Sequence, residues 1–136
     1  MANQQTVEFS LLEPGHQFPP ASYILETSLV EAYLKATEET CPVYRQERLV
    51  PPTAVAAYAM AALAEGIDLP PGTIHISQEI ESIKHACVND TITSRAKVSG
   101  KRNRGKLELL TIDIDVTNQN GESVLSGKTT FLAPQQ

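Results

Sequence analysis

An alanine-rich segment constrains the fold of this chain more than any other feature. Seven of the eleven residues from 54 to 64 are alanine, and Tyr58 is the one polar residue among them. Alanine has the highest helix propensity and Gly66 is a typical terminator, so the sequence predicts a helix over 54–65 with Thr53 as its N-cap. Because this helix is apolar nearly all round, we expect it to be buried.

The second half of the chain has the pattern of antiparallel strands. None of the nine prolines lies between Pro71 and Pro134, and interior strands exclude proline because it lacks the backbone donor that pairs strands. Apolar and polar residues alternate in this half, and turn residues separate the runs. We expect strands at 74–84 (with a bulge near Ile80), 92–98, 110–116 and 124–132, a hairpin tip at 101–105 and a tight turn at Asn120-Gly121.

The first half combines one short strand with one short helix. Residues 23–26 are compatible with a strand, and Ser28-Leu29-Val30-Glu31 matches the capping-box pattern of a helix start. Apolar residues then recur at helical spacing, which predicts a helix over about 29–39. Together these elements predict a single α+β domain over residues 1–136, with room for one core.

Composition limits the classes of function. A formal net charge of −5 argues against general nucleic-acid binding. No apolar run is long enough to span a bilayer, so we expect no membrane partner. The start of the chain lacks a secretion signal and the two cysteines form no disulfide framework, so we expect a cytoplasmic protein. No metal-ligand spacing is present among histidines and cysteines, and we expect neither a metal nor another cofactor.

The order of these elements resembles the hotdog fold, in which an antiparallel sheet wraps around a central helix, and in particular its MaoC-like hydratase/dehydratase branch. That branch carries Gly-Asp-x-Asn-Pro-x-His at the end of the short helix, where this chain has the run from Glu38 to Tyr44. Pro42 matches, Glu39 stands in place of the aspartate and Tyr44 in place of the histidine. Together with Val50-Pro51-Pro52-Thr53, Tyr44 is more similar to the N-terminal-type MaoC domains, in which the catalytic pair is often missing.

The resemblance implies an acyl-CoA or acyl-carrier thioester as ligand, with Glu39 as acid/base and Tyr44 orienting a water. Histidine exchanges protons near neutral pH, whereas tyrosine, with a pKa near 10, is a poor base. Glu39 also carries its carboxylate one methylene further out than aspartate, a misplacement of about 1 Å that can cost about a hundredfold in rate. The competing interpretation is structural: Glu39 is a solvated residue at a helix end and Tyr44 packs on the loop.

The resemblance also implies a substrate site. Its expected residues are Pro51, Pro52, Thr53 and Tyr58 at the start of the central helix, and Arg102 and Arg104 in a basic run that could meet phosphates or an acidic carrier protein. For the arginines, a solvated hairpin end is the competing interpretation.

Three functions stay open on the sequence. The chain can be a hydratase/dehydratase, or a non-catalytic acyl-chain-binding subunit whose partner supplies the aspartate and histidine. Thioesterases of the hotdog fold usually place a carboxylate near the start of the central helix. This helix carries none before Glu65, so the resemblance disfavours a thioesterase. One curved sheet leaves an exposed edge, so we expect a homodimer or a heterodimer with a related hotdog chain.

Overall fold

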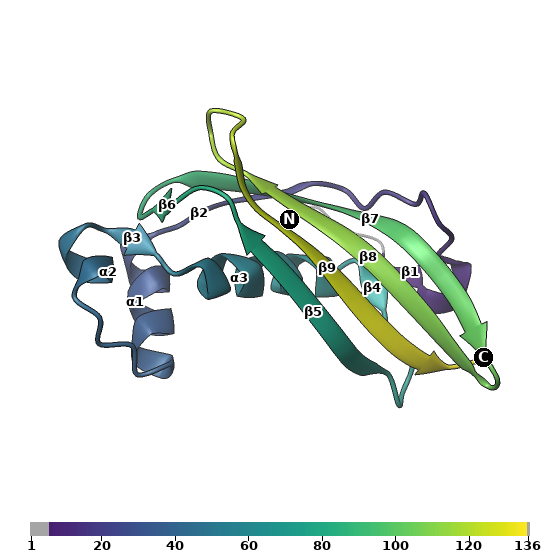
Figure 1. Cartoon of the computed structure of the whole chain (residues 1–136). Coiled ribbons are helices and arrows are strands. Elements are labelled where there is room, and N and C mark those ends of the chain that lie inside the picture. The colour runs from purple at the N-terminus through teal and green to yellow at the C-terminus, as the bar shows by residue number, and fades with distance from the viewer. Residues whose placement is uncertain (1–5, 136) are drawn as a thin grey trace.

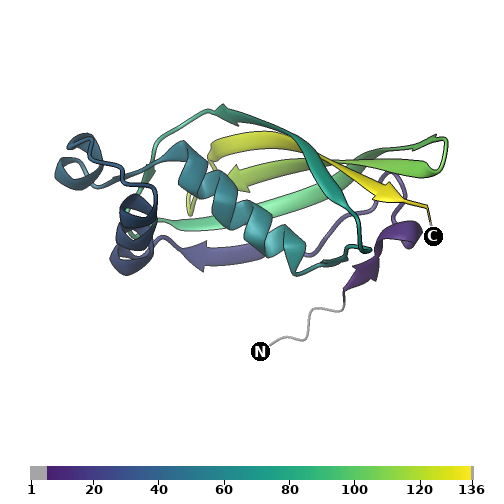
Figure 2. The ribbon, with the colours of Figure 1, turned by 90° about the horizontal axis from the view of Figure 1, so that it is seen from below.

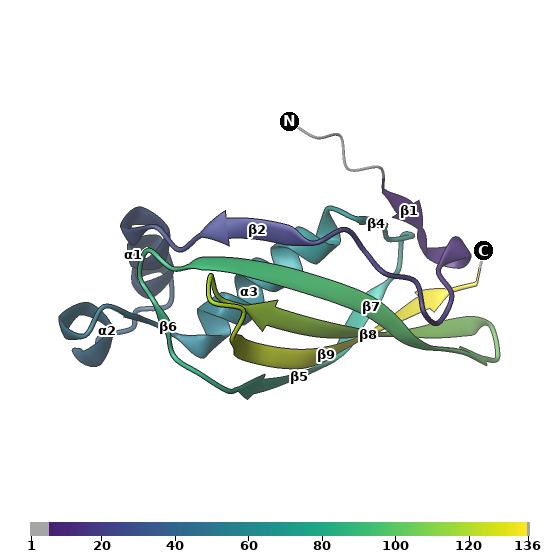
Figure 3. The ribbon, with the colours of Figure 1, turned by 90° about the horizontal axis from the view of Figure 1, so that it is seen from above.

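The computed structural model describes residues 6–135, which form a curved antiparallel sheet packed against one long helix (Figure 1). The sheet order is β2 (Ala21–Ile24), β7 (Thr91–Arg104), β8 (Leu107–Thr117), β9 (Ser123–Pro134) and β5 (Ile74–Ser82), with β2 and β5 at the two edges (Figure 3). The helix, α3 (Pro52–Ala64), lies on the concave face of the sheet (Figure 2). This arrangement confirms the predicted α+β hotdog fold.

Shorter elements complete the described chain. A parallel pair joins β1 (Val7–Glu8) to β4 (Ile67–Asp68), and an antiparallel pair joins β3 (Leu49–Val50) to β6 (Ala86–Cys87). One 3-10 turn, η1 (Phe9–Leu11), and two helices, α1 (Thr27–Ala36) and α2 (Val43–Gln46), lie outside the sheet. Within residues 6–135, no helix combines the length and apolarity that a bilayer crossing requires.

The alternation of β8 decides which face of the sheet forms the core. Leu110, Ile112, Ile114 and Val116 are buried, whereas Asp113 and Asp115 between them are exposed. Successive side chains of a strand point to opposite faces, so the convex face of the sheet is polar and the concave face packs on α3.

The central helix is buried on one side only. Its buried residues are Ala54, Val55, Ala59 and Leu63. Ala57, Ala61 and Ala64 are exposed. Figure 2 shows no described helix or strand across the side of α3 that faces away from the sheet. The prediction of all-round burial is therefore wrong for the chain by itself, because one sheet covers only one side of a helix.

Two helix starts differ from the predicted ones. Helix α3 begins at Pro52 with Pro51 at the N-cap, so Thr53 lies in the first turn and does not cap the helix. Proline suits this place because its fixed φ is helical and its missing N–H would have no acceptor there. Helix α1 begins at Thr27 with Glu26 at the N-cap, so Ser28 does not form the predicted capping box.

The strand details also shift. The β7–β8 turn is Gly105-Lys106, with Gly105 at φ 63°, whereas residues 101–104 are paired strand residues. The bulge of β5 lies between His75 and Ser77, not near Ile80. The turn at Asn120-Gly121 is confirmed, with Gly121 at φ 76°.

Candidate functional site

The end of α1 explains one position of the degenerate motif. Glu38 has φ 55°, a left-handed conformation that β-carbon-bearing residues rarely adopt. The amide of Glu38 donates to the Lys35 carbonyl at 3.2 Å, and the amide of Glu39 donates to the Leu34 carbonyl at 2.9 Å, which closes the helix. The motif of the MaoC-like branch has glycine at this position, and glycine adopts this conformation without strain.

The Glu39 carboxylate is held by its own loop. Its Oε1 accepts a hydrogen bond from the Cys41 backbone N–H at 2.9 Å. The guanidinium of Arg45 donates to the Glu39 carbonyl oxygen at 3.4 Å and to Glu31 Oε2 at 3.2 Å, which fixes the loop against α1. Glu39 lines an open groove of about 500 Å³ between α1 and this loop.

Tyr44 does not line that groove. It lies in α2, half-buried, and its ring packs against the hydrophobic core. The groove contains no residue of α3 either. Among the residues that the structure describes, Glu39 lines this groove and Tyr44 does not, so the two residues predicted to act together on one water do not share it.

The first turn of α3 presents two possible hydrogen-bond donors, the amide and the hydroxyl of Thr53. Ala54 and Val55 donate their amides to the Pro51 carbonyl at 2.9 and 3.2 Å, and the two prolines have no N–H to offer. The amide of Thr53 is thus the first-turn donor left for a ligand, since the first amides of a helix lack intrahelical acceptors. The Tyr33 hydroxyl donates to Thr53 Oγ1 at 2.8 Å, so the Thr53 hydroxyl keeps its own hydrogen free to donate.

Three tyrosines surround this start of the helix. The ring of Tyr58 meets those of Tyr23 and Tyr33 edge-on, each with centroids 6.3 Å apart, and the Tyr58 hydroxyl donates to the Leu29 carbonyl at 3.3 Å. Burial, with the nearby Tyr33 and Tyr23, raises the pKa of Tyr58. Burial also raises the pKa of Tyr23, against the opposing effect of its hydrogen bond to Ser94. The hydroxyls of Tyr58 and Tyr23 therefore remain protonated at neutral pH.

Of the predicted substrate residues, the structure brings together the four at the start of α3. Pro51 is buried, Pro52 and Thr53 are exposed, and Tyr58 is half-buried one turn later. The sequence did not single out Tyr33 as the partner of Thr53. The helical spacing of α1 places Tyr33 on a packed face, but the acceptor of its hydroxyl, twenty residues away, has no local signal.

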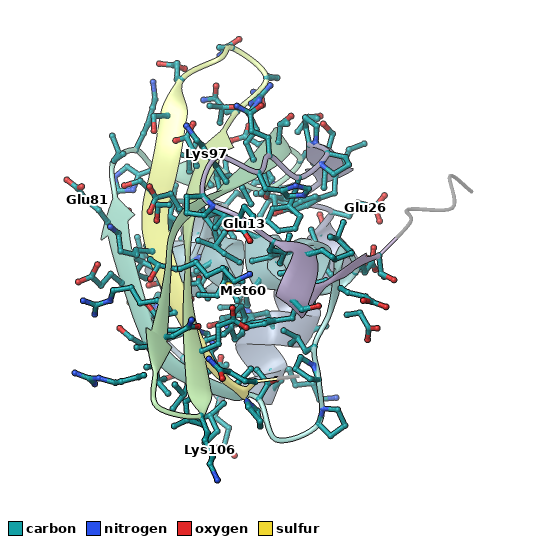
Figure 4. The ribbon with its side chains drawn as sticks, turned by 90° about the vertical axis from the view of Figure 1, so that its right-hand side faces the viewer. Glu13, Glu26, Met60, Glu81, Lys97 and Lys106 are labelled. Atoms are coloured by element: carbon teal, nitrogen blue, oxygen red, sulfur yellow. The ribbon has the colours of Figure 1, made fainter. Side chains whose placement is uncertain are left out.

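The two predicted arginines lie elsewhere. Arg102 and Arg104 are at the far end of β7, about 40 Å of strand from its start beside α1. Nearby Lys101 is not available to a ligand because its ammonium pairs with Glu13 at 3.4 Å and with Glu108 at 3.2 Å. The exposed bases at this end are Arg102, Arg104 and Lys106, the last of which is labelled at the turn in Figure 4.

Three solved structures share this fold at low identity. An R-hydratase, PhaJ1, from Pseudomonas aeruginosa superposes with a TM-score of 0.79 at 20% identity, covering 93% of this chain and 85% of that chain. A MaoC-like dehydratase from Rhodospirillum rubrum superposes with a TM-score of 0.78 at 19% identity, covering 94% of this chain and 97% of that chain. The HadBC 3R-hydroxyacyl-ACP dehydratase complex from Mycobacterium tuberculosis superposes with a TM-score of 0.72 at 17% identity, covering 88% of this chain and 96% of that chain.

Sequence comparison gives two results. No curated protein matches this chain. The family model described as the FAS1-like dehydratase domain region matches residues 13–126, which is most of the chain and includes the α1–α2 loop, α3 and the sheet through β8. The chain belongs to this dehydratase-domain family, and its fold is the hotdog fold of MaoC-like hydratases and dehydratases.

Proposed function

We propose that this chain is the acyl-thioester-binding subunit of a hydratase/dehydratase, and that a related hotdog chain supplies the catalytic aspartate and histidine. The dehydratase family supports the reaction class. The HadBC dehydratase, whose fold this chain shares, is itself a complex.

The position of Glu39 is the observation that carries the proposal. Its carboxylate accepts the Cys41 amide within its own loop and opens on a groove that contains neither Tyr44 nor any residue of α3. A general acid or base must come within hydrogen-bond reach of the proton it transfers, about 2.6–3.2 Å. The groove of Glu39 contains no residue of α3, so a ligand seated on α3 alone would not enter it.

Thr53 is our proposed contact for the thioester carbonyl. Its amide and its hydroxyl both lie in the first turn of α3, where the helix dipole favours negative charge on an oxygen. The hydrogen bond that the Tyr33 hydroxyl donates to Thr53 Oγ1 holds the threonine side chain in place. The acyl chain would then follow the exposed alanines 57, 61 and 64 along the helix, enclosed by the partner chain.

The edge strand β5 is our proposed place for that partner. All nine of its residues are exposed, and Ile74, Ile76 and Ile80 are among the most exposed large apolar side chains of the described residues. An unpaired edge strand that exposes apolar side chains is a template for pairing with another chain. The opposite edge is unsuited to pairing, because β2 has only four residues and follows Pro19-Pro20.

The first test is hydration of crotonyl-CoA by the purified chain. We expect saturable binding of acyl-CoA by isothermal titration calorimetry, without hydration above the buffer rate. Glu39→Gln and Tyr44→Phe should bind as the wild type does, because neither side chain contacts the proposed ligand position. Hydration that falls at least tenfold in Glu39→Gln would instead support the catalytic alternative, with Glu39 as acid/base and Tyr44 orienting water.

A second test concerns Thr53 alone. Thr53→Val removes the hydroxyl donor while keeping the side-chain shape, and one hydrogen bond contributes about 1 kcal/mol. We expect acyl-CoA affinity to fall about five- to tenfold by the same calorimetry. Thr53→Ser keeps the hydroxyl and should bind within about twofold of the wild type. Equal affinity of Thr53→Val and wild type would remove Thr53 from the site.

A further inference from the structure

The unpaired edge of β5 is acidic as well as apolar. The strand carries Glu79 and Glu81 and no lysine or arginine. Glu79 pairs in register with Lys128 of β9, so both glutamates lie on the convex face of the sheet, since residues opposite each other share a face. Figure 4 shows Glu81 pointing away from the sheet at this edge.

The neighbouring bases leave these carboxylates largely unneutralised. Lys84, just after β5, is paired with Glu122. Lys128 lies 3.7 Å from Asp113 on the other side of β9. The described residues show no ion pair within 4.0 Å for Glu79 or Glu81.

Pairing β5 with a second copy of itself would place like charges together. An antiparallel pair related by a two-fold axis must be centred on one residue, because opposite residues share a face. Centred on Ile80, the axis sets Glu79 opposite Glu81 of the second copy, twice. Centred on Glu79 or Glu81, it sets that glutamate opposite itself. Like charges directly opposite destabilise a sheet.

Registers centred further toward the start of β5 avoid direct opposition but keep four carboxylates on one face of the seam. The two chains would also bring together a formal net charge of −5 each. A self-paired β5 is therefore opposed electrostatically, although its apolar residues and the exposed face of α3 still need a cover.

We propose that the partner of β5 is a different hotdog chain whose edge strand carries lysine or arginine opposite Glu79 and Glu81. A hotdog chain fits because the surface needs both a strand edge and an apolar helix face to cover it. Basic residues fit because they turn two repulsive contacts into cross-strand ion pairs. This inference rests on the proposed function and names the partner that supplies the catalytic pair.

The test introduces a basic β5 edge into this chain by mutation. The Glu79→Lys/Glu81→Lys variant serves as the basic partner strand, and association is measured by sedimentation equilibrium in 50 mM NaCl. We expect wild type mixed with this variant to associate at least tenfold more tightly than either chain with itself. Salt should weaken the mixed pair and strengthen wild-type self-association, because screening reduces both attraction and repulsion.

The control is Glu8→Lys/Asp68→Lys, which changes the charge equally on the β1–β4 pair. It should associate with wild type less tightly than the edge variant does. A wild-type homodimer with a Kd below about 1 µM that does not tighten with salt would overturn the inference. If the edge variant fails to fold, as judged by circular dichroism, the salt response of wild type alone decides. Neither result depends on acyl-CoA binding, so failure here leaves the ligand proposal to its own tests.

Discussion

Replacing Gly127 with alanine should lower the free energy of unfolding by about 2 kcal/mol. A β-carbon at Gly127 would lie 2.8 Å from the backbone carbonyl oxygen of Glu79 on the neighbouring strand β5. Backbone cannot rotate away as a side-chain end can, so β5 must move from β9, and overpacking of this kind costs about 1–3 kcal/mol. The measurement is equilibrium urea unfolding, in which the midpoint should fall at unchanged slope.

Gly100 provides the matched control on β7. A β-carbon there would meet the nearest atom, in the side chain of Thr111, at 3.8 Å, an ordinary contact. Gly100→Ala should be neutral or stabilise by up to about 1 kcal/mol, because alanine reduces the entropy of the unfolded chain. Equal losses for both variants would contradict the specific role of Gly127, which is to let β5 approach the sheet closely enough to serve as its edge.

Local patterns predicted the elements that depend on local chemistry. The alternation of Leu110, Ile112 and Ile114 with exposed Asp113 is a property of neighbouring residues, and the structure confirms the strand and its buried face. The alanine-rich run likewise predicted α3, because helix propensity is local. The start of α3 was misplaced because its two prolines fit the N-cap and first helical positions better than the threonine that follows.

Contacts between distant segments could not be predicted in the same way. The hydrogen bond from Tyr33 to Thr53 and the pairing of Lys101 with Glu13, 88 residues apart, arise from packing alone. The exposure of Ala57 and Ala61 has a similar cause. An apolar helix surface predicts burial but does not say whether the cover comes from the same chain. Here the chain covers one side of α3, and the remaining apolar side is the surface that we propose a partner covers.

Replacing Ala61 with glutamine should weaken association by about a hundredfold. Ala61 lies exposed on the uncovered side of α3, between Ala57 and Ala64, the side that the proposed partner covers when no acyl chain is bound. Glutamine would separate the two surfaces and bury an amide without assured partners, at about 1–3 kcal/mol for each effect. The measurement is sedimentation equilibrium, which gives the Kd of the pair formed by the Ala61→Gln chain and the Glu79→Lys/Glu81→Lys chain.

Ala32→Gln makes the same replacement at an exposed position of α1, in the groove of Glu39, which contains no residue of α3 or β5. Glutamine is a good helix former, so neither variant should unfold its helix, and thermal melts of both should stay close to that of wild type. The control pair should keep its Kd within about twofold. If Ala61→Gln also keeps its Kd, the partner does not cover α3, and pairing would depend on the β5 edge alone. A joint loss in both variants would mean that glutamine acts through the stability of the chain, so the difference between them measures what the uncovered face of α3 contributes.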